Sequence, residues 1–321
     1  YELNSESSRR KRPNKQSQVF IPDCETSEYT QAKQDRTSTN DPMSPSQPPH
    51  LIKQRFIDQR GVWDDDWEAL LKLNPAYLEA YLTIQDVSQR QNRLSPKVQE
   101  FIYIAVAACT THIHAPGIRA HVKAAFAAGA TADEIMEVVG LTYLVGIHTV
   151  TLGAPLLLEL MAEEGIQGAG AFQIDEERQR IKDSFIKRRG FWTDTWNPLL
   201  QLDPNFFEAY VDFSSLPAKT GVLEPKVREL VTCAFDAATT HLYGRGTKIH
   251  MRNALKLGAT PGEIMEMLEI TSLMGIDGVT IAAPLVLEQL GSKGGNADSG
   301  VAASLATTTD DTFIKGAGTS G

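Results

Sequence analysis

Apolar side chains recur with helical spacing through the middle of the chain, and polar residues fill the positions between them. The clearest stretches are residues 135–144 and 264–274, where apolar positions follow the 3.6-residue period of a helix. The sequences TADE (131–134) and TPGE (260–263) directly precede these stretches and have the form of a helix capping box. No alternation with period two is bounded by turn residues, so the pattern predicts an all-α fold.

Further boundaries of the predicted helices can be placed from single residues. Ser95 is a capping residue before Pro96, and a broad apolar face runs from Val98 to about Thr111. Gly129 is expected to end the next helix, because a residue without Cβ readily adopts the left-handed conformation. The proline in LLKLNP (70–75) predicts a break between two helices near the start of the unit.

The helical pattern occurs twice in the chain, as an internal repeat. A shift of 129 positions aligns residues 52–160 with 181–289 without a gap, and about 47 of roughly 109 positions are identical. Two tandem helical repeats of domain size are therefore expected. The predicted organisation is an N-terminal disordered tail (1–50), repeat 1 (51–162), a charged linker (163–180), repeat 2 (181–290) and a C-terminal disordered tail (291–321).

Composition and charge narrow the class of protein. The net charge is −9 and the pI about 5.3, which argues against nucleic acid or anionic lipid as a general partner. The mean hydropathy of −0.23 and the polar N-terminus lead us to expect no membrane span and a cytoplasmic location. The three cysteines have no paired spacing, which excludes a disulfide framework and a cysteine-rich zinc site.

Residues that could take part in catalysis or in ligand binding recur at matched positions of the two repeats. The chain has only seven histidines, and four of them lie in two repeated pairs. The matched positions are Glu100/Glu229, His112/His241 and His121/His250, with His148 replaced by Asp277, and His114 by Tyr243.

A carboxylate and an imidazole are expected to meet in each repeat. Glu100 and His121 can face each other if the turn around Pro116 and Gly117 folds the next helix back. Such a couple would transfer protons, each group shifting the pKa of the other toward neutrality. Two alternatives stay open: the couple is a structural pair, or His112 and its counterpart interact with the dipole of a helix C-terminus.

Metal and thiol chemistry are not expected from the spacing. His112, His114 and His121 are suitable ligands, but the second copy has Tyr243 in place of His114 and shows no carboxylate at an obvious spacing. We therefore assign no metal ligands and expect no cofactor. Cys109 and Cys233 lie at apolar helix positions and are interpreted as inert core residues, and the paired tryptophans (63/67 and 192/196) as packing anchors.

The pattern Glu100 … HVKAAFAAGATADEIME (121–137) resembles the carboxymuconolactone decarboxylase and alkylhydroperoxidase D superfamily. It recurs from Glu229 through His250 and GAT (258–260) to Glu266, so the resemblance covers about two thirds of the chain. The resemblance implies an all-helical fold that assembles as trimers or hexamers. A tandem chain would then form a homotrimer with six units, a pseudo-hexamer.

The peroxidase branch of that superfamily has a Cys-x-x-Cys pair before the histidine. Here those positions hold His114 and Gly117, and Tyr243 and Gly246 in the second copy, so a peroxidase (peroxiredoxin activity) is the disfavoured alternative. A non-catalytic scaffold that kept only the fold is a third possibility.

The decarboxylase branch implies a lyase acting on a small carboxylated lactone or enol-type metabolite. The predicted catalytic residues are Glu100, His112, His121, Glu229, His241 and His250, with the histidines as acids and the glutamates orienting them. The predicted substrate-binding residues are His114, Arg119, Tyr243, Lys248 and His148, and Arg119 and Lys248 would bind the carboxylate. Because the repeats differ at His114 and His148, we expect the two sites to be unequal.

Overall fold

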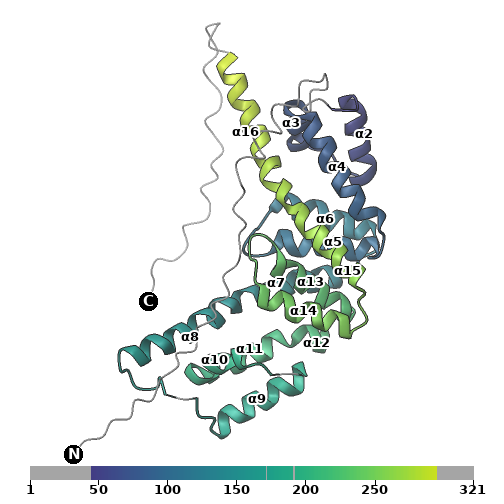
Figure 1. Cartoon of the computed structure of the whole chain (residues 1–321). Coiled ribbons are helices and arrows are strands. Elements are labelled where there is room, and N and C mark those ends of the chain that lie inside the picture. Colours follow the sequence, from purple (N-terminus) through teal and green to yellow (C-terminus); the bar gives the residue numbers. More distant parts are fainter. Residues whose placement is uncertain (1–44, 171, 191, 295–321) are drawn as a thin grey trace, which may run out of the picture. The chain divides into compact units, whose positions relative to one another are not determined.

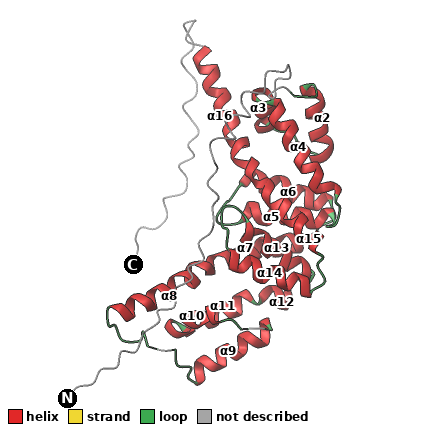
Figure 2. Cartoon of the chain, viewed as in Figure 1, coloured by secondary structure: helices red, strands yellow, loops and turns green. Residues whose placement is uncertain are grey.

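The computed structural model describes residues 45–170, 172–190 and 192–294. These residues form helices and connecting turns and contain no strand, so the all-α prediction is confirmed (Figures 1 and 2). Repeat 1 contains α2 (Pro49–Arg60), α3 (Asp65–Leu73), α4 (Pro75–Arg90), α5 (Pro96–Ala108), α6 (Ala115–Ala127), α7 (Ala132–Thr142), η1 (Tyr143–Gly146) and α8 (Ile147–Glu163). Repeat 2 contains α9 (Glu176–Arg189), η2 (Asp194–Trp196), α10 (Asn197–Leu202), α11 (Pro204–Ser214), α12 (Leu216–Thr220), α13 (Pro225–Ala237), α14 (Gly244–Lys256), α15 (Pro261–Ser272), η3 (Leu273–Ile276) and α16 (Asp277–Gly294).

The local signals place these helices as expected. Ser95 accepts a hydrogen bond from the backbone N–H of Val98 at the start of α5. Both capping boxes form, at the first residues of α7 and α15. Gly129 has φ +83°, in the left-handed region, directly after α6, and the break between α3 and α4 falls at Asn74 and Pro75.

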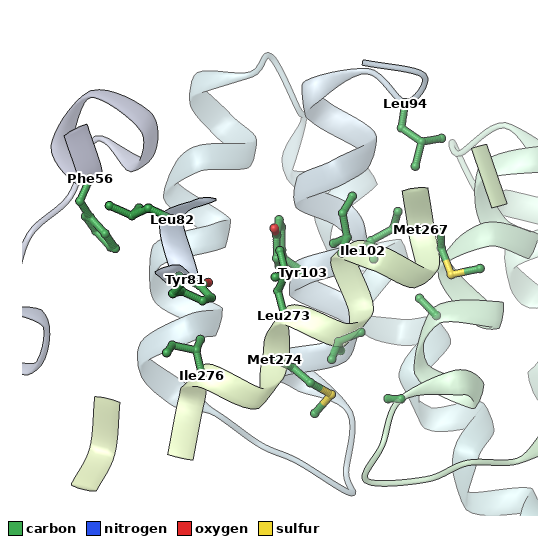
Figure 3. Close-up of a cluster of buried hydrophobic side chains, with 14 of the residues drawn as sticks. Phe56, Tyr81, Leu82, Leu94, Ile102, Tyr103, Met267, Leu273, Met274 and Ile276 are labelled. Carbon is green, nitrogen blue, oxygen red and sulfur yellow. The ribbon is translucent and has the colours of Figure 1, made fainter. Parts of the chain in front are cut away.

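The two repeats interlock rather than forming separate domains. Helix α16 of repeat 2 packs on α3 of repeat 1, α8 of repeat 1 packs on α10 of repeat 2, and α5 packs on α13. The largest apolar core is therefore shared: Phe56, Tyr81 and Tyr103 of repeat 1 lie in one cluster with Met267 and Leu273 of repeat 2 (Figure 3). The predicted repeats are units of sequence, but each core is completed by the other repeat.

Some predicted boundaries are wrong. The second part of the predicted linker is helical, because α9 begins at Glu176, where Asp175 caps it. Helix α2 begins at Pro49, inside the predicted N-terminal tail, and α16 extends to Gly294, inside the predicted C-terminal tail. Residues 1–44 and 295–321 lie outside the described part of the chain, and so do the tail predictions made for them.

Two buried glutamates hold one repeat to the other. Glu266 on α15 is fully buried and accepts hydrogen bonds from the backbone N–H groups of Arg93 and Leu94 and from the side chain of Gln99, all in repeat 1. Its counterpart Glu137 accepts hydrogen bonds from two backbone N–H groups of the turn before α13 and pairs with Arg228 on α13. The glutamate that ends the repeated sequence motif thus joins the two repeats.

The stretches Ala132–Glu163 and Pro261–Gly291 are long and apolar enough, by length and composition alone, to cross a membrane. Our expectation of no such segment is not met on that criterion. Each stretch is interrupted by a 3₁₀ turn, η1 or η3. His148 and Asp277, in the first turn of the helices that follow, each line a cavity. Only 17% and 39% of the most apolar windows are buried within the chain, which leaves apolar surface on α8 and α16.

Candidate active sites between the repeats

Two cavities at corresponding places are built from both repeats. The first, of about 130 Å³, lies among α2, α5, α6 and the η3–α16 segment of repeat 2. The second, of about 260 Å³, lies among α9, α13, α14 and the η1–α8 segment of repeat 1. Each cavity contains one of the predicted Glu–His couples.

The first couple joins α5 to α6. His121 Nδ1 lies 2.7 Å from Glu100 Oε2, so the turn between the helices brings the two groups together as expected. His114 caps α6 by accepting a hydrogen bond from the N–H of Gly117. A Cβ on Gly117 would lie 2.6 Å from His114 Nδ1, so glycine is required for this close approach. Pro116 and Gly117 therefore set the fold-back that forms the couple.

The electrostatics of His121 differ from our expectation. Burial lowers the pKa of His121 and outweighs the opposing effect of the hydrogen bond that the imidazole donates to Glu100. The imidazole also stacks on Tyr103, with ring centroids 4.3 Å apart and planes inclined by 6°. The pKa of this histidine thus moves away from neutrality, and the prediction of a shift toward it is wrong.

Arg60 is a site residue that sequence reasoning missed. Its guanidinium donates a hydrogen bond to the hydroxyl of Tyr81 and lies 5.0 Å from the ring centroid of Tyr103, both in the first cavity. Burial lowers the pKa of Arg60, but Tyr81, Tyr103 and Glu100 together raise it above its usual value, so the group is cationic. The available signal was the repeated Arg-Gly dipeptide, which places Arg189 in the second cavity.

The second couple has the same geometry and different surroundings. His250 Nδ1 lies 2.7 Å from Glu229 Oε2, and Asn253 also donates a hydrogen bond to this oxygen. Asp236 Oδ2 lies 3.8 Å from His250 Nε2, where repeat 1 has Ala107. Burial raises the pKa of Asp236 to about 7, and the charge of His250 opposes this rise.

His112 and His241 reach across to the other repeat instead of joining the Glu–His couples. Nε2 of His112 lies 2.7 Å from Asp277 Oδ2, and Nε2 of His241 lies 2.7 Å from His148 Nδ1. His114 Nδ1 lies 3.2 Å from the same oxygen of Asp277. Both histidines follow the end of a helix, but their partners are these side chains.

The predicted carboxylate binders are not in the cavities. Arg119 and Lys248 are exposed, and within the described structure neither lines the first or second cavity. The prediction that they bind substrate at these sites is wrong, because position 119 lies two residues from His121 on α6 and faces away. His114, His148 and Tyr243 do line a cavity.

The cysteines and tryptophans lie where the sequence placed them, and two of the tryptophans also line a cavity. Cys109 and Cys233 are buried and free, and burial raises the pKa of the Cys233 thiol to about 12. Trp63 packs edge-on against Phe56, as a packing anchor does. Trp67 packs on the same ring and also lines the first cavity, and its counterpart Trp196 lines the second.

The fold and the sites define a tandem helical protein with a half-buried carboxylate–imidazole couple in each of two cavities. The model of the carboxymuconolactone decarboxylase family matches residues 75–146 and 204–289. The crystal structure of a "putative gamma-carboxymuconolactone decarboxylase subunit" from Burkholderia xenovorans LB400 is 45% identical to the chain. It aligns over 78% of this chain and 100% of that one, with a TM-score of 0.75. No curated protein gives a significant match. The chain belongs to the carboxymuconolactone decarboxylase family.

Proposed function

We propose that the chain is a decarboxylase of a small carboxylated lactone or enol-type metabolite, and that His121 supplies the proton. The proposal is carried by one observation: the Glu100–His121 couple shares a partly enclosed cavity with Arg60, a half-buried arginine. Family membership and the name given to the structural relative support this class of reaction.

The reaction needs an acid that protonates one carbon atom of the intermediate left by the loss of CO₂. Loss of CO₂ breaks a C–C bond and leaves the electron pair on the lactone as a dienolate. The proton on His121 Nε2 goes to carbon, while Nδ1–H stays hydrogen-bonded to Glu100 Oε2 and fixes the tautomer. The neutral imidazole then takes a proton from water. Glu100 orients the ring and stabilises the imidazolium before transfer.

Arg60 has the charge that the dienolate requires. A cation placed against the departing carboxylate would stabilise the ground state and raise the barrier, so its useful position is beside the enolate oxygen. Arg60 lies in a low-dielectric site where such a contact is strong, and Tyr81 holds its guanidinium in place. This arginine takes the role of anion binder that the sequence assigned to Arg119.

The two cavities are proposed to be unequal. Four arginines line the second cavity, at 188, 189, 228 and 245, so charge alone does not exclude an anion there. The buried Asp236, however, lies 3.8 Å from His250 Nε2 and occupies the place beside the proton-donating nitrogen, whereas the first cavity has an alanine at the matching position. We therefore place the main decarboxylase activity in the first cavity.

The test is turnover of a carboxylated muconolactone, followed by CO₂ release, in matched variants of the two couples. His121→Asn should lower kcat by about 10²–10⁴-fold, the usual contribution of a general acid, and His250→Asn by much less. Arg119→Gln, an exposed change on the same helix, is the control and should keep full activity. Equal losses in the two histidine variants would contradict the unequal sites, and no loss in either would overturn the acid assignment.

We also propose that the chain associates with copies of itself, as a homotrimer with six helical units. Support comes from apolar side chains left exposed at matching positions of α8 and α16: Leu152 and Leu156 on the first, Ile281 and Leu285 on the second. Light scattering on the purified protein should give three times the chain mass. The double variant Leu156→Glu/Leu285→Glu should give a smaller species, and a monomeric parent protein would refute the proposal.

A further inference from the structure

A second group of three side chains lies beyond the Glu229–His250 couple, and two of them, His148 and Asp236, line the second cavity. His148, Asp236 and His241 each place one nitrogen or oxygen atom within 4.8 Å of the other two. They come from different elements: His148 from α8 of repeat 1, Asp236 from the last turn of α13, and His241 from the turn that follows. The cluster forms only where the two repeats interlock.

The buried carboxylate of Asp236 has no hydrogen-bond donor among the described residues. The residue is 1% exposed, and neither of its oxygens accepts a hydrogen bond from the described residues. The nearest ionisable nitrogen, Nε2 of His250, is 3.8 Å away, beyond hydrogen-bond distance. A buried carboxylate without partners is costly unless a cation or a proton neutralises it.

The two histidines of the cluster have the protonation state that a metal ligand requires. Burial, with the charges of His241 and His250, lowers the pKa of His148 to about 4, and burial lowers the pKa of His241. Both imidazoles are therefore neutral near pH 7, the form that binds metals. Their facing nitrogens are 2.7 Å apart, and ligand atoms around a zinc-sized ion lie about 3.0–3.4 Å apart, so a small side-chain shift makes room.

A second cluster with the same types of metal-ligating side chain forms around repeat 1, from residues at other positions. There the cluster is His112, His114 and Asp277, again two imidazoles and one carboxylate. The substitutions are compensated: Tyr243 replaces His114, and Asp236 restores a third ligand at a position that is alanine in repeat 1. In repeat 1 the carboxylate already contacts both of its histidines, at 2.7 and 3.2 Å, so the two clusters share composition but only the second has an unpartnered carboxylate.

We propose that His148, Asp236 and His241 bind one divalent first-row transition-metal ion, such as Zn²⁺ or Co²⁺, across the interface between the repeats. Two imidazoles and one carboxylate with open positions are a recognised ligand set for such ions. His148 and Asp236 line the second cavity, so an ion held by them would offer a Lewis acid to an anionic oxygen of a carboxylate or enolate ligand there. The site goes beyond the proton transfer proposed above, which it neither requires nor supports.

The test is direct metal binding by the untagged full chain, so that turnover is not the readout. Protein treated with chelator and dialysed is titrated with CoCl₂, followed by visible absorption and by calorimetry. Asp236→Asn removes the unpartnered carboxylate with little change of shape, and Asp277→Asn is the matched control in the other cluster. His241→Ala is a second variant in case Asp236→Asn does not fold, and circular dichroism checks each protein.

The expected result is a saturable site of one Co²⁺ per chain with a visible d–d spectrum. Its affinity should fall at least tenfold in Asp236→Asn and in His241→Ala and stay within twofold in Asp277→Asn. Three results would overturn the proposal: no binding at micromolar Co²⁺, equal affinity in Asp236→Asn and the parent protein, or equal losses in Asp236→Asn and Asp277→Asn.

Discussion

Replacing Asp236 by asparagine should make the metal-free protein more stable above pH 7. Burial raises the pKa of this carboxyl from 3.8 to about 7. A folded-state pKa above the unfolded value means that the stability contribution is fully present below about pH 4 and is lost as pH rises through 7. Above pH 7 the ionised carboxylate therefore lowers the free energy of unfolding, and Asp236→Asn removes that effect.

The size of the effect follows from the same values. The difference between about 7 and 3.8 is roughly three pH units, and at about 1.4 kcal/mol per unit this gives a ceiling of about 4 kcal/mol above pH 7. The asparagine amide is then left without a partner, which costs about 1–3 kcal/mol. The expected net gain at pH 8 is about 1–3 kcal/mol, and near pH 4 the variant should be no more stable than the parent.

The measurement is urea unfolding in chelator at pH 4.5, 6, 7 and 8. The parent protein should lose stability relative to the variant across this range, and the difference should change sign or vanish at the acidic end. Asp277→Asn is the control: its carboxylate is paired with His112, so this change should destabilise the protein. A variant of Asp236 that is less stable at pH 8 and follows the parent at every pH would refute the electrostatic reasoning.

Three further predictions concern the interlock, a helix end and the proposed acid. Glu266→Gln should lower the free energy of unfolding by about 2–4 kcal/mol, measured by urea unfolding, because a buried carboxylate that accepts three hydrogen bonds becomes an amide that mismatches them. Gly129→Ala should cost about 1 kcal/mol in the same assay, since φ is +83° and an added Cβ meets no atom within 4 Å; a larger loss would point to an unseen contact. The kcat/KM for lactone turnover should rise as pH falls from 8 toward 6, because burial lowers the pKa of His121 and its acidic form is scarce at pH 8; a flat profile would contradict its role.

Local chemistry made the helices and one half of each site predictable. The proline at position 75, the capping serine at 95 and the left-handed glycine at 129 act within a few residues, so their effect does not depend on the rest of the fold. The meeting of Glu100 with His121 depended only on a tight turn between consecutive helices. The local signals and the Glu100–His121 contact are all short-range in sequence, and they were correctly predicted.

The other half of each site depends on packing between the repeats, which periodicity does not encode. An apolar helix has the same 3.6-residue pattern whether it packs on its own repeat or on the other one. The sequence therefore did not indicate that α8 packs on repeat 2 and α16 on repeat 1. The partners of His112 and His241 lie 165 and 93 residues away in sequence. Asp236 escaped attention because its position is alanine in repeat 1, and a comparison of the repeats highlights only what they share.

The covalent link between the repeats explains why the two sites can differ. In an assembly of identical chains, one substitution changes every copy of a site, whereas a tandem chain carries separate residues at positions such as 148 and 277. These residues differ in a coupled way. Changing His148 to aspartate, to match repeat 1, would set a second carboxylate against the buried Asp236, and the two like charges would destabilise each other. Conversion of the second site into the first therefore requires changes at both 148 and 236. This coupling keeps the carboxylate paired with imidazoles in the first cluster and without a hydrogen-bond partner among the described residues in the second.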